Sequence, residues 1–338
     1  MMPLKTGIIA LISTSGAKCD RPDQGTGFAG SRHCQRRHRS KRGSEAMPDR
    51  AHPSHPKRAS IVRSLPLVLL GLLAAPLPAA AAGANATGDL PQARTARGNG
   101  SIAEARLVHP TDRYRHFVLG AEVEAAGLQV RLKDGRTLQI DLPADQVFED
   151  RRPRIVDLDG DGRDEVVLVR SSLKSGSAIV VVAERSGMLA IVAEGPPTGA
   201  PRRWLNPAGI ADFDGDGHLD IAYVQQPHAV GRLRVFTLRK GALVEIAATG
   251  NTSNHVAGSD QMGLSAVADF DGDGVADLAV PSFDRTRLRF LSFKGGVHEI
   301  GTKPLNGQAV ADFTLVVTAG HPAVEVGLAG GRREQVSP

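Results

Sequence analysis

The sequence predicts an all-β protein, a β-propeller of about five four-stranded blades over residues 101–338. Three observations favour this fold class. The chain of 338 residues holds 38 Gly and 21 Pro, a turn-rich composition that does not suit long helices. An acidic segment occurs three times, and its first aspartates, Asp157, Asp212 and Asp269, are 55 and 57 residues apart. Short runs of strand-type sequence separated by turn residues fill each period, which indicates a repeat architecture.

Residues 1–86 carry the basic charge of the chain. They hold 13 of the 41 Lys and Arg and 4 of the 36 Asp and Glu. The remaining chain therefore has a formal charge of −4, whereas the whole chain has +5. It has no strong run of Lys or Arg, so we expect no nucleic-acid partner.

This segment also has the layout of a secretory signal peptide. Arg63 precedes the apolar run 65–75, and small residues follow as far as Ala86. An 11-residue run is too short for a bilayer, which needs about 20 residues, so we expect cleavage and no membrane span afterwards. The protein is thus predicted to be secreted or periplasmic. Both cysteines, Cys19 and Cys34, precede the signal, so the mature chain is expected to lack disulfides.

The predicted organisation has four parts. We expect residues 1–46 to be an unstructured extension or a misassigned start, 47–86 to be the signal peptide, 87–100 to be a linker and 101–338 to be the propeller.

Four short strands are predicted in each period. The second and third periods give the clearest sets, at 209–212, 220–224, 232–239 and 243–248, and at 265–269, 277–280, 287–293 and 297–300. A divergent first unit is expected at 117–123, 128–132 and 137–141, and a last one at 315–318, 323–327 and 334–336. A β-helix would have much shorter coils, and a sandwich would not repeat its sequence, so both are less favoured.

The acidic segments have the spacing of metal-binding loops. In the first one, Asp, Asp, Asp, Arg and Glu stand at positions 1, 3, 5, 7 and 9, where Arg163 is expected to contribute its backbone carbonyl. Gly162 at position 6 permits the sharp turn that such a loop needs. Oxygen donors with several carboxylates suit Ca²⁺, whereas zinc would require His or Cys. An EF-hand is excluded because position 12 is apolar and strand-type sequence follows the loop.

The pattern apolar-x-Asp-Phe-Asp-Gly-Asp-Gly-x-x-Asp-apolar resembles the FG-GAP/VCBS-type repeat of integrin alpha-chain-like β-propellers. The resemblance covers about residues 101–338 and implies up to three calcium ions, each in the loop between the first and second strands of a blade. It implies these ligands: Asp157, Asp159, Asp161, the Arg163 carbonyl and Glu165; Asp212, Asp214, Asp216, the His218 carbonyl and Asp220; Asp269, Asp271, Asp273, the Val275 carbonyl and Asp277.

A ligand-binding face is expected away from these loops. Two long loops, 194–207 and 251–263, lead into neighbouring blades, and loops on a rigid scaffold commonly bind ligands. The candidate residues are Arg202, Trp204, Asn254, His255 and Asp260. The alternative for Trp204 is packing against a neighbouring blade.

These patterns favour a binding module for a protein or carbohydrate ligand. The chain holds neither a G-x-S-x-G motif nor an H-E-x-x-H motif, so catalysis has little support. An alternative is a polysaccharide-acting lyase or hydrolase on the same fold, because fold does not fix function. A structural or assembly subunit is a third possibility.

Overall fold

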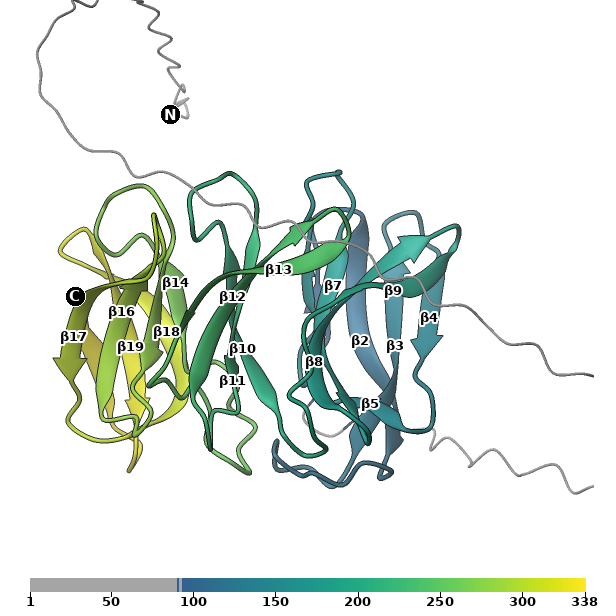
Figure 1. Ribbon diagram of the computed structural model, residues 1–338, viewed down its shortest axis with the longest axis horizontal. Helices are drawn as coiled ribbons and strands as arrows, with labels where there is room; N and C mark the ends of the chain where they lie inside the picture. The colour runs from purple at the N-terminus through teal and green to yellow at the C-terminus, as the bar shows by residue number, and fades with distance from the viewer. Residues whose placement is uncertain (1–89, 91–92) are drawn as a thin grey trace, which may run out of the picture. The chain divides into compact units, whose positions relative to one another are not determined.

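The computed structural model describes residue 90 and residues 93–338, and these residues form an all-β structure (Figure 1). The predicted extension and signal peptide lie outside the described residues. Within the described part of the chain, no helix is long and apolar enough to cross a membrane.

Twenty strands follow one another along the described residues. The first nine form one sheet: β1 (Ala96–Arg97), β2 (Ile102–Thr111), β3 (Glu124–Leu132), β4 (Thr137–Asp141), β5 (Gln146–Phe148), β6 (Arg154–Val156), β7 (Glu165–Ser172), β8 (Gly176–Arg185) and β9 (Met188–Glu194). Two four-stranded sheets follow: β10 (Leu205–Ala211), β11 (Asp220–Gln225), β12 (Arg232–Arg239) and β13 (Ala242–Thr249), then β14 (Ala266–Ala268), β15 (Asp277–Pro281), β16 (Arg287–Ser292) and β17 (His298–Pro304). The last sheet has β18 (Ala309–Thr318), β19 (His321–Leu328) and β20 (Arg333–Val336).

Each of the last three sheets is an antiparallel meander in which successive strands pair with one another. The nine-stranded sheet consists of two such meanders, β1–β4 and β6–β9, which β5 joins. Strand β5 pairs with β7 through three residues and with β3 only through Ala125 and Phe148. The prediction of an all-β protein with four-stranded antiparallel units is therefore confirmed, whereas the number of blades and the closure of a ring stay predictions.

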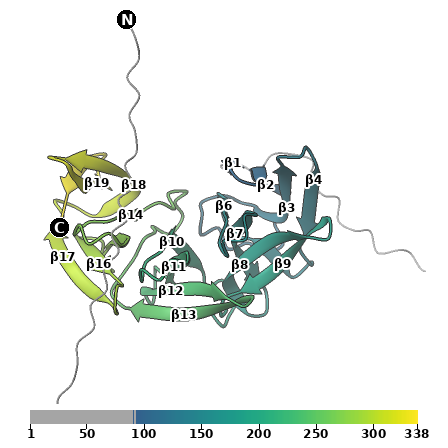
Figure 2. The same ribbon diagram turned by 90° about the horizontal axis from the view of Figure 1, so that it is seen from above.

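The sheets follow one another along an arc, with β2–β4 at one end and β18–β19 at the other (Figure 2). Their first strands approach one another, because β10 contacts β14 and β14 contacts β18. Buried amides join the neighbouring units: Asn206 Nδ2 donates to the carbonyl of Asn254 at 3.0 Å, and Asn254 Nδ2 donates to that of Pro207 at 3.1 Å. These bonds satisfy polar groups that would otherwise be costly to bury.

Hydrophobic cores lie between neighbouring meanders, and the acidic segments supply part of three of the four core clusters among the described residues. The second residue of each segment, Leu158, Phe213 or Phe270, is buried. Phe213 meets Phe293 edge to face at 5.5 Å between ring centroids, and Phe270 meets Phe290 at 4.9 Å. An aromatic pair of this kind adds to the stabilisation from its buried area. The apolar residue after the first aspartate therefore anchors the loop to the sheets.

Two predictions for the N-terminal part are wrong. Residues 117–123 do not form a strand, because the backbone turns at Arg115 and Phe117, whose φ angles are 52° and 57°. The first meander uses β2 instead. The predicted linker 87–100 contains β1, which pairs with β2, and Leu90 is 6% exposed within the core, so ordered structure begins before residue 101.

Candidate metal centres

The three acidic loops occupy equivalent places in three successive meanders. They connect β6 to β7, β10 to β11, and β14 to β15. In each, the first aspartate directly follows a strand, and the ninth residue is the first residue of the next strand. The loop therefore begins and ends on paired backbone, which fixes the distance that it spans.

The first aspartate of each loop organises the turn by accepting backbone N–H groups. One of its carboxylate oxygens accepts the N–H of the glycine at position 6, at 3.0, 2.9 and 2.9 Å in the three loops. These glycines, Gly162, Gly217 and Gly274, have φ angles of 85°, 87° and 85°, a conformation that side chains disfavour. The glycine at position 4, which the sequence argument did not use, also has a positive φ in every loop.

The ninth residue of each loop is a buried carboxylate with one oxygen that lacks a partner. Glu165, Asp220 and Asp277 are at most 1% exposed. One oxygen of each accepts the N–H of the second loop residue, at 3.0, 3.0 and 2.9 Å. The other oxygen, Glu165 Oε1, Asp220 Oδ1 or Asp277 Oδ1, is buried without a hydrogen bond. A buried carboxylate oxygen in this state is costly unless a cation compensates it.

The pKa values of these carboxyls reflect the same imbalance. Burial, together with the charges of Asp159 and Asp161, raises the pKa of Glu165 to about 7. Burial raises the pKa of Asp220 to about 6, and the charges of Asp214 and Asp216 add to this effect. The pKa of Asp277 is also raised, mainly by burial. A bound cation would favour the ionised forms and reverse these shifts.

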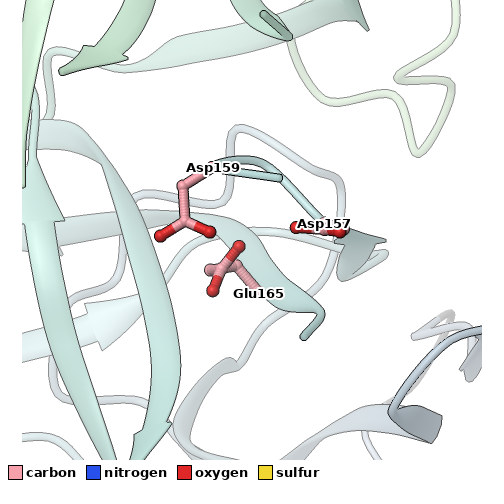
Figure 3. A group of neighbouring side chains, drawn as sticks. All are labelled: Asp157, Asp159 and Glu165. Atoms are coloured by element: carbon pink, nitrogen blue, oxygen red, sulfur yellow. The ribbon is translucent and has the colours of Figure 1, made fainter. Parts of the chain in front are cut away.

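Carboxylates of each loop converge on one point. Asp157, Asp159 and Glu165 each place an oxygen within 4.8 Å of the other two, and Figure 3 shows Asp159 and Glu165 facing one another. The second and third loops have equivalent groups: Asp212, Asp214 and Asp220; Asp269, Asp271 and Asp273. Grouped carboxylates with a partnerless buried oxygen fit a hard divalent cation, whose preferred ligands are oxygens.

Comparison with known families agrees with this geometry. The model of the FG-GAP-like repeat matches residues 157–223 and again 212–280. This chain carries FG-GAP-like repeats. The matches overlap at the second acidic loop, so the three loops belong to one repeated pattern. The chain has no significant match among curated proteins.

Position 5 of the FG-GAP-like loops has a second role that the sequence did not predict. Asp216 forms an ion pair with Arg239 at 2.6 Å, and Asp273 forms one with Lys294 at 3.0 Å. These cations come from the third strand of the same sheet or the turn after it. Position 5 therefore helps to attach the loop to its own sheet. It belongs to the converging group only in the third loop.

Position 7 holds a different residue in each loop: Arg163, His218 or Val275. The side chain of Arg163 forms an ion pair with Glu184 on β8. The predicted carbonyl ligands at Arg163, His218 and Val275 stay predictions.

The predicted ligand face is wrong for three of its five residues, because they are buried. Trp204 is 2% exposed, and its Nε1–H donates to the carbonyl of Glu149 at 3.0 Å. His255 is fully buried and packs edge to face on Trp204 at 4.7 Å between centroids. Asn254 is fully buried and bonds to the neighbouring unit as described above. Their apolar and hydrogen-bonding capacity is used inside the protein, so packing of Trp204, the alternative given above, is the correct one.

The remaining two residues are accessible. Arg202 is exposed, and its backbone N–H donates to the Tyr114 hydroxyl at 2.8 Å. Asp260 is half-buried and accepts a bond from the side chain of Gln261 at 3.0 Å. A role for these two in binding stays a prediction.

Asp150 is an organising residue that sequence analysis missed. Its buried carboxylate accepts the backbone N–H groups of Arg151, Arg152 and Val169 at 2.8, 3.1 and 3.0 Å. It also pairs with Arg154 at 2.7 Å. The run Glu149-Asp-Arg-Arg-Pro-Arg154 was the available signal, because a carboxylate amid four polar neighbours is well placed to hold a turn.

Proposed function

We propose that this chain is an exported β-propeller-like module that is stabilised by calcium and binds a protein or a glycan. The observation that carries the calcium part is the buried carboxylate at position 9 of each loop, with one oxygen that lacks a partner. Three loops repeat this arrangement, so an accidental cluster is a poor explanation. The FG-GAP-like repeats support a propeller-like binding module.

Calcium is favoured over magnesium and zinc by the donors and by the loop. The donors are carboxylates on a glycine-containing turn, and the loops contain neither Cys nor a converging His. Ca²⁺ accepts six to eight oxygens at variable angles, whereas Mg²⁺ needs a tight octahedron that usually retains several waters. In the first two loops, the residues that would hold the ion are those at positions 1, 3 and 9. In the third loop, the converging group consists of positions 1, 3 and 5, and the partnerless oxygen of Asp277 at position 9 would be a further donor.

The ions would have a structural role. Each loop joins the first and second strands of a meander and places its second residue in the core. A cation in the loop would therefore offset repulsion among the carboxylates where two strands enter a sheet. An extracellular or periplasmic location suits this role, because extracellular calcium modules operate with dissociation constants of about 10⁻⁴–10⁻³ M.

Binding is favoured over catalysis by how the acidic residues are used. Most carboxylates of the three acidic loops lie in the candidate ion sites. Glu149 and Asp150 are buried, and each accepts hydrogen bonds from the surrounding protein. They are poorly placed for proton transfer to a substrate.

Metal analysis of the purified mature protein tests the proposal. After dialysis against calcium, we expect three ions per chain, and excess chelator should remove them and lower the melting temperature. Calcium should restore the melting temperature at lower concentration than magnesium. A melting curve that is the same with and without chelator would refute the calcium assignment.

A further inference from the structure

A cavity of about 500 Å³ lies where the first strands of several units face one another. It is lined by β1 and the segment before it, by β6 and the segment before it, by β10, by the segment before β14, and by Asp312 on β18. The candidate metal residues are not part of its lining. This volume is within the usual range for sites that hold small organic molecules and exceeds the space that a single inorganic ion needs.

The lining is strongly positive. Among the described residues it includes five arginines: Arg94, Arg97, Arg151, Arg152 and Arg154. The only acidic residues in the described lining are Asp260 and Asp312. The chain outside residues 1–86 has a formal charge of −4, so the positive charge of the lining is opposite in sign to the net charge of this part of the chain. The five arginines come from two segments, 94–97 and 151–154, which are far apart in the sequence. Neither segment alone has as many arginines as the cavity.

Two of these arginines serve the structure. Arg154 pairs with the buried carboxylate of Asp150, and Arg151 donates to the carbonyl of Leu119 at 2.8 Å. Arg94, Arg97 and Arg152 are exposed. Arg97 reaches Glu104 only at 3.9 Å, and the side chains of Arg94 and Arg152 form no hydrogen bond or ion pair with the described residues. These three guanidinium groups are therefore available to a ligand.

The backbone that carries the available arginines is firmly held. Asp150 accepts the N–H of Arg152 at 3.1 Å and that of Arg151 at 2.8 Å. The N–H of Arg94 donates to the carbonyl of Arg151 at 2.8 Å, which joins the two arginine-bearing segments. Because the backbone is already fixed, a ligand that binds the arginines has to order only their side chains, which lowers the entropic cost of binding.

From this arrangement we propose that the cavity binds a small organic anion that carries two or more oxyanion groups, such as an acidic sugar. Guanidinium groups match carboxylate and sulfate oxygens through paired hydrogen bonds, and three of them on two segments favour a ligand with separated negative groups. Ser265 also lines the cavity, and its hydroxyl, which donates to the carbonyl of Ala208 at 2.7 Å, can accept a hydrogen bond from a ligand hydroxyl group. This inference specifies the ligand class of the proposed binding module and rests on that proposal.

The test uses the mature protein with calcium and calorimetric titration at low salt. The probes are a sulfated uronic-acid disaccharide, inorganic sulfate and the neutral disaccharide maltose. The disaccharide acid should bind most tightly, sulfate more weakly and maltose not at all. Added salt should weaken the binding, because charge attraction carries much of it.

The variant pair Arg94→Ala and Arg152→Ala, combined in one chain, should weaken disaccharide binding by at least about tenfold. Arg106→Ala is the matched control, because Arg106 is an exposed arginine on β2 that binds Gln129 and does not line the cavity. It should bind within about twofold of the unaltered protein. Calcium content and melting temperature are measured in parallel.

Equal disaccharide affinity in the double variant, or absence of binding to the unaltered protein, would overturn the inference. So would sulfate that binds as tightly as the disaccharide, because the site would then take a single inorganic ion. If calcium content is normal in these cases, the proposed calcium-stabilised module stands and only the ligand class fails. If the unaltered protein binds no calcium, the proposed function itself is contradicted.

Discussion

The loop between β14 and β15 and the middle of β18 begin with the same residues, Ala-Asp-Phe, and have different structures. In the loop, Asp269 turns the chain and accepts the N–H groups of Gly272 and Gly274. In β18, Asp312 lies inside a strand and accepts the N–H of Gly263 from the neighbouring unit at 2.7 Å. These three shared residues therefore do not by themselves make an ion loop. The glycines at positions 4 and 6 and the carboxylate at position 9 make the difference, and the last unit lacks all three.

Of the changes that distinguish the loops from β18, removing calcium should have the largest effect on stability. Each of the three loops would lose an ion that offsets its grouped carboxylates, whereas β18 would be unaffected. At calcium concentrations of 100 times Kd, three ions add about 8 kcal/mol to the free energy of unfolding. That corresponds to a fall of about 15–30 °C in melting temperature with chelator for a domain of this size. Differential scanning calorimetry measures it, and a fall of under about 3 °C would contradict it.

Removing one ligand should cost one ion. Asp214→Ala and Asp271→Ala delete carboxylates that belong to converging groups, so each variant should bind two calcium ions and lose about 3 kcal/mol of calcium-dependent stability. Asp312→Ala is the control. It should keep all three ions, although it leaves the Gly263 N–H without its acceptor, at a cost of about 1–3 kcal/mol. Metal analysis decides between the two outcomes, and loss of an ion from Asp312→Ala would show that β18 is also an ion site.

Neutralising the carboxylate at position 9 should change the free energy of unfolding in opposite directions with and without calcium. In chelator, Glu165→Gln removes a buried charge that lacks a full set of partners, so it should raise the free energy of unfolding relative to the unaltered protein by about 1 kcal/mol. In calcium it should lower stability, because a ligand is lost. Asp312→Asn should act in the same direction in both buffers. Denaturant titrations with and without calcium measure this, and a Glu165→Gln variant that is destabilised equally in both would exclude the ion from this loop.

The pH dependence of stability should arise from the same buried carboxyl at position 9. The folded pKa of Glu165 is raised to about 7, above the ordinary value near 4.5. For a carboxyl with a raised pKa, the calcium-free protein loses stability as pH rises through this interval, because the unfolded chain ionises first. Calcium should reverse this trend, so the gain in melting temperature on adding calcium should grow between about pH 4.5 and 7. A calcium effect that is constant over this range would contradict the assignment of position 9 as a ligand.

The sequence predicted the repeated features well because local chemistry determines them. Alternating apolar residues specify strands such as β12, and Asp-Gly pairs specify tight turns whatever surrounds them. The strands that begin at Asp220 and Asp277 were also predicted correctly, since apolar residues follow both aspartates. By contrast, residues 117–123 look like a strand in isolation. They turn at Phe117 instead, while Val118 and Leu119 pack into a core that the sequence does not show.

The sequence by itself therefore determined the meanders, the three loops and the identity of the carboxylates that could hold ions. Only the tertiary structure decided the partners of residues that are far apart in the chain. Trp204 and His255 read as surface residues of long loops, yet they are buried because neighbouring units close over them. The arginines of the cavity come from β1 and the segment before it, and from β6 and the segment before it. They meet because the backbone N–H of Arg94 donates to the carbonyl of Arg151. Burial and charge density depend on which surfaces meet, and a linear pattern with a short period contains no record of that.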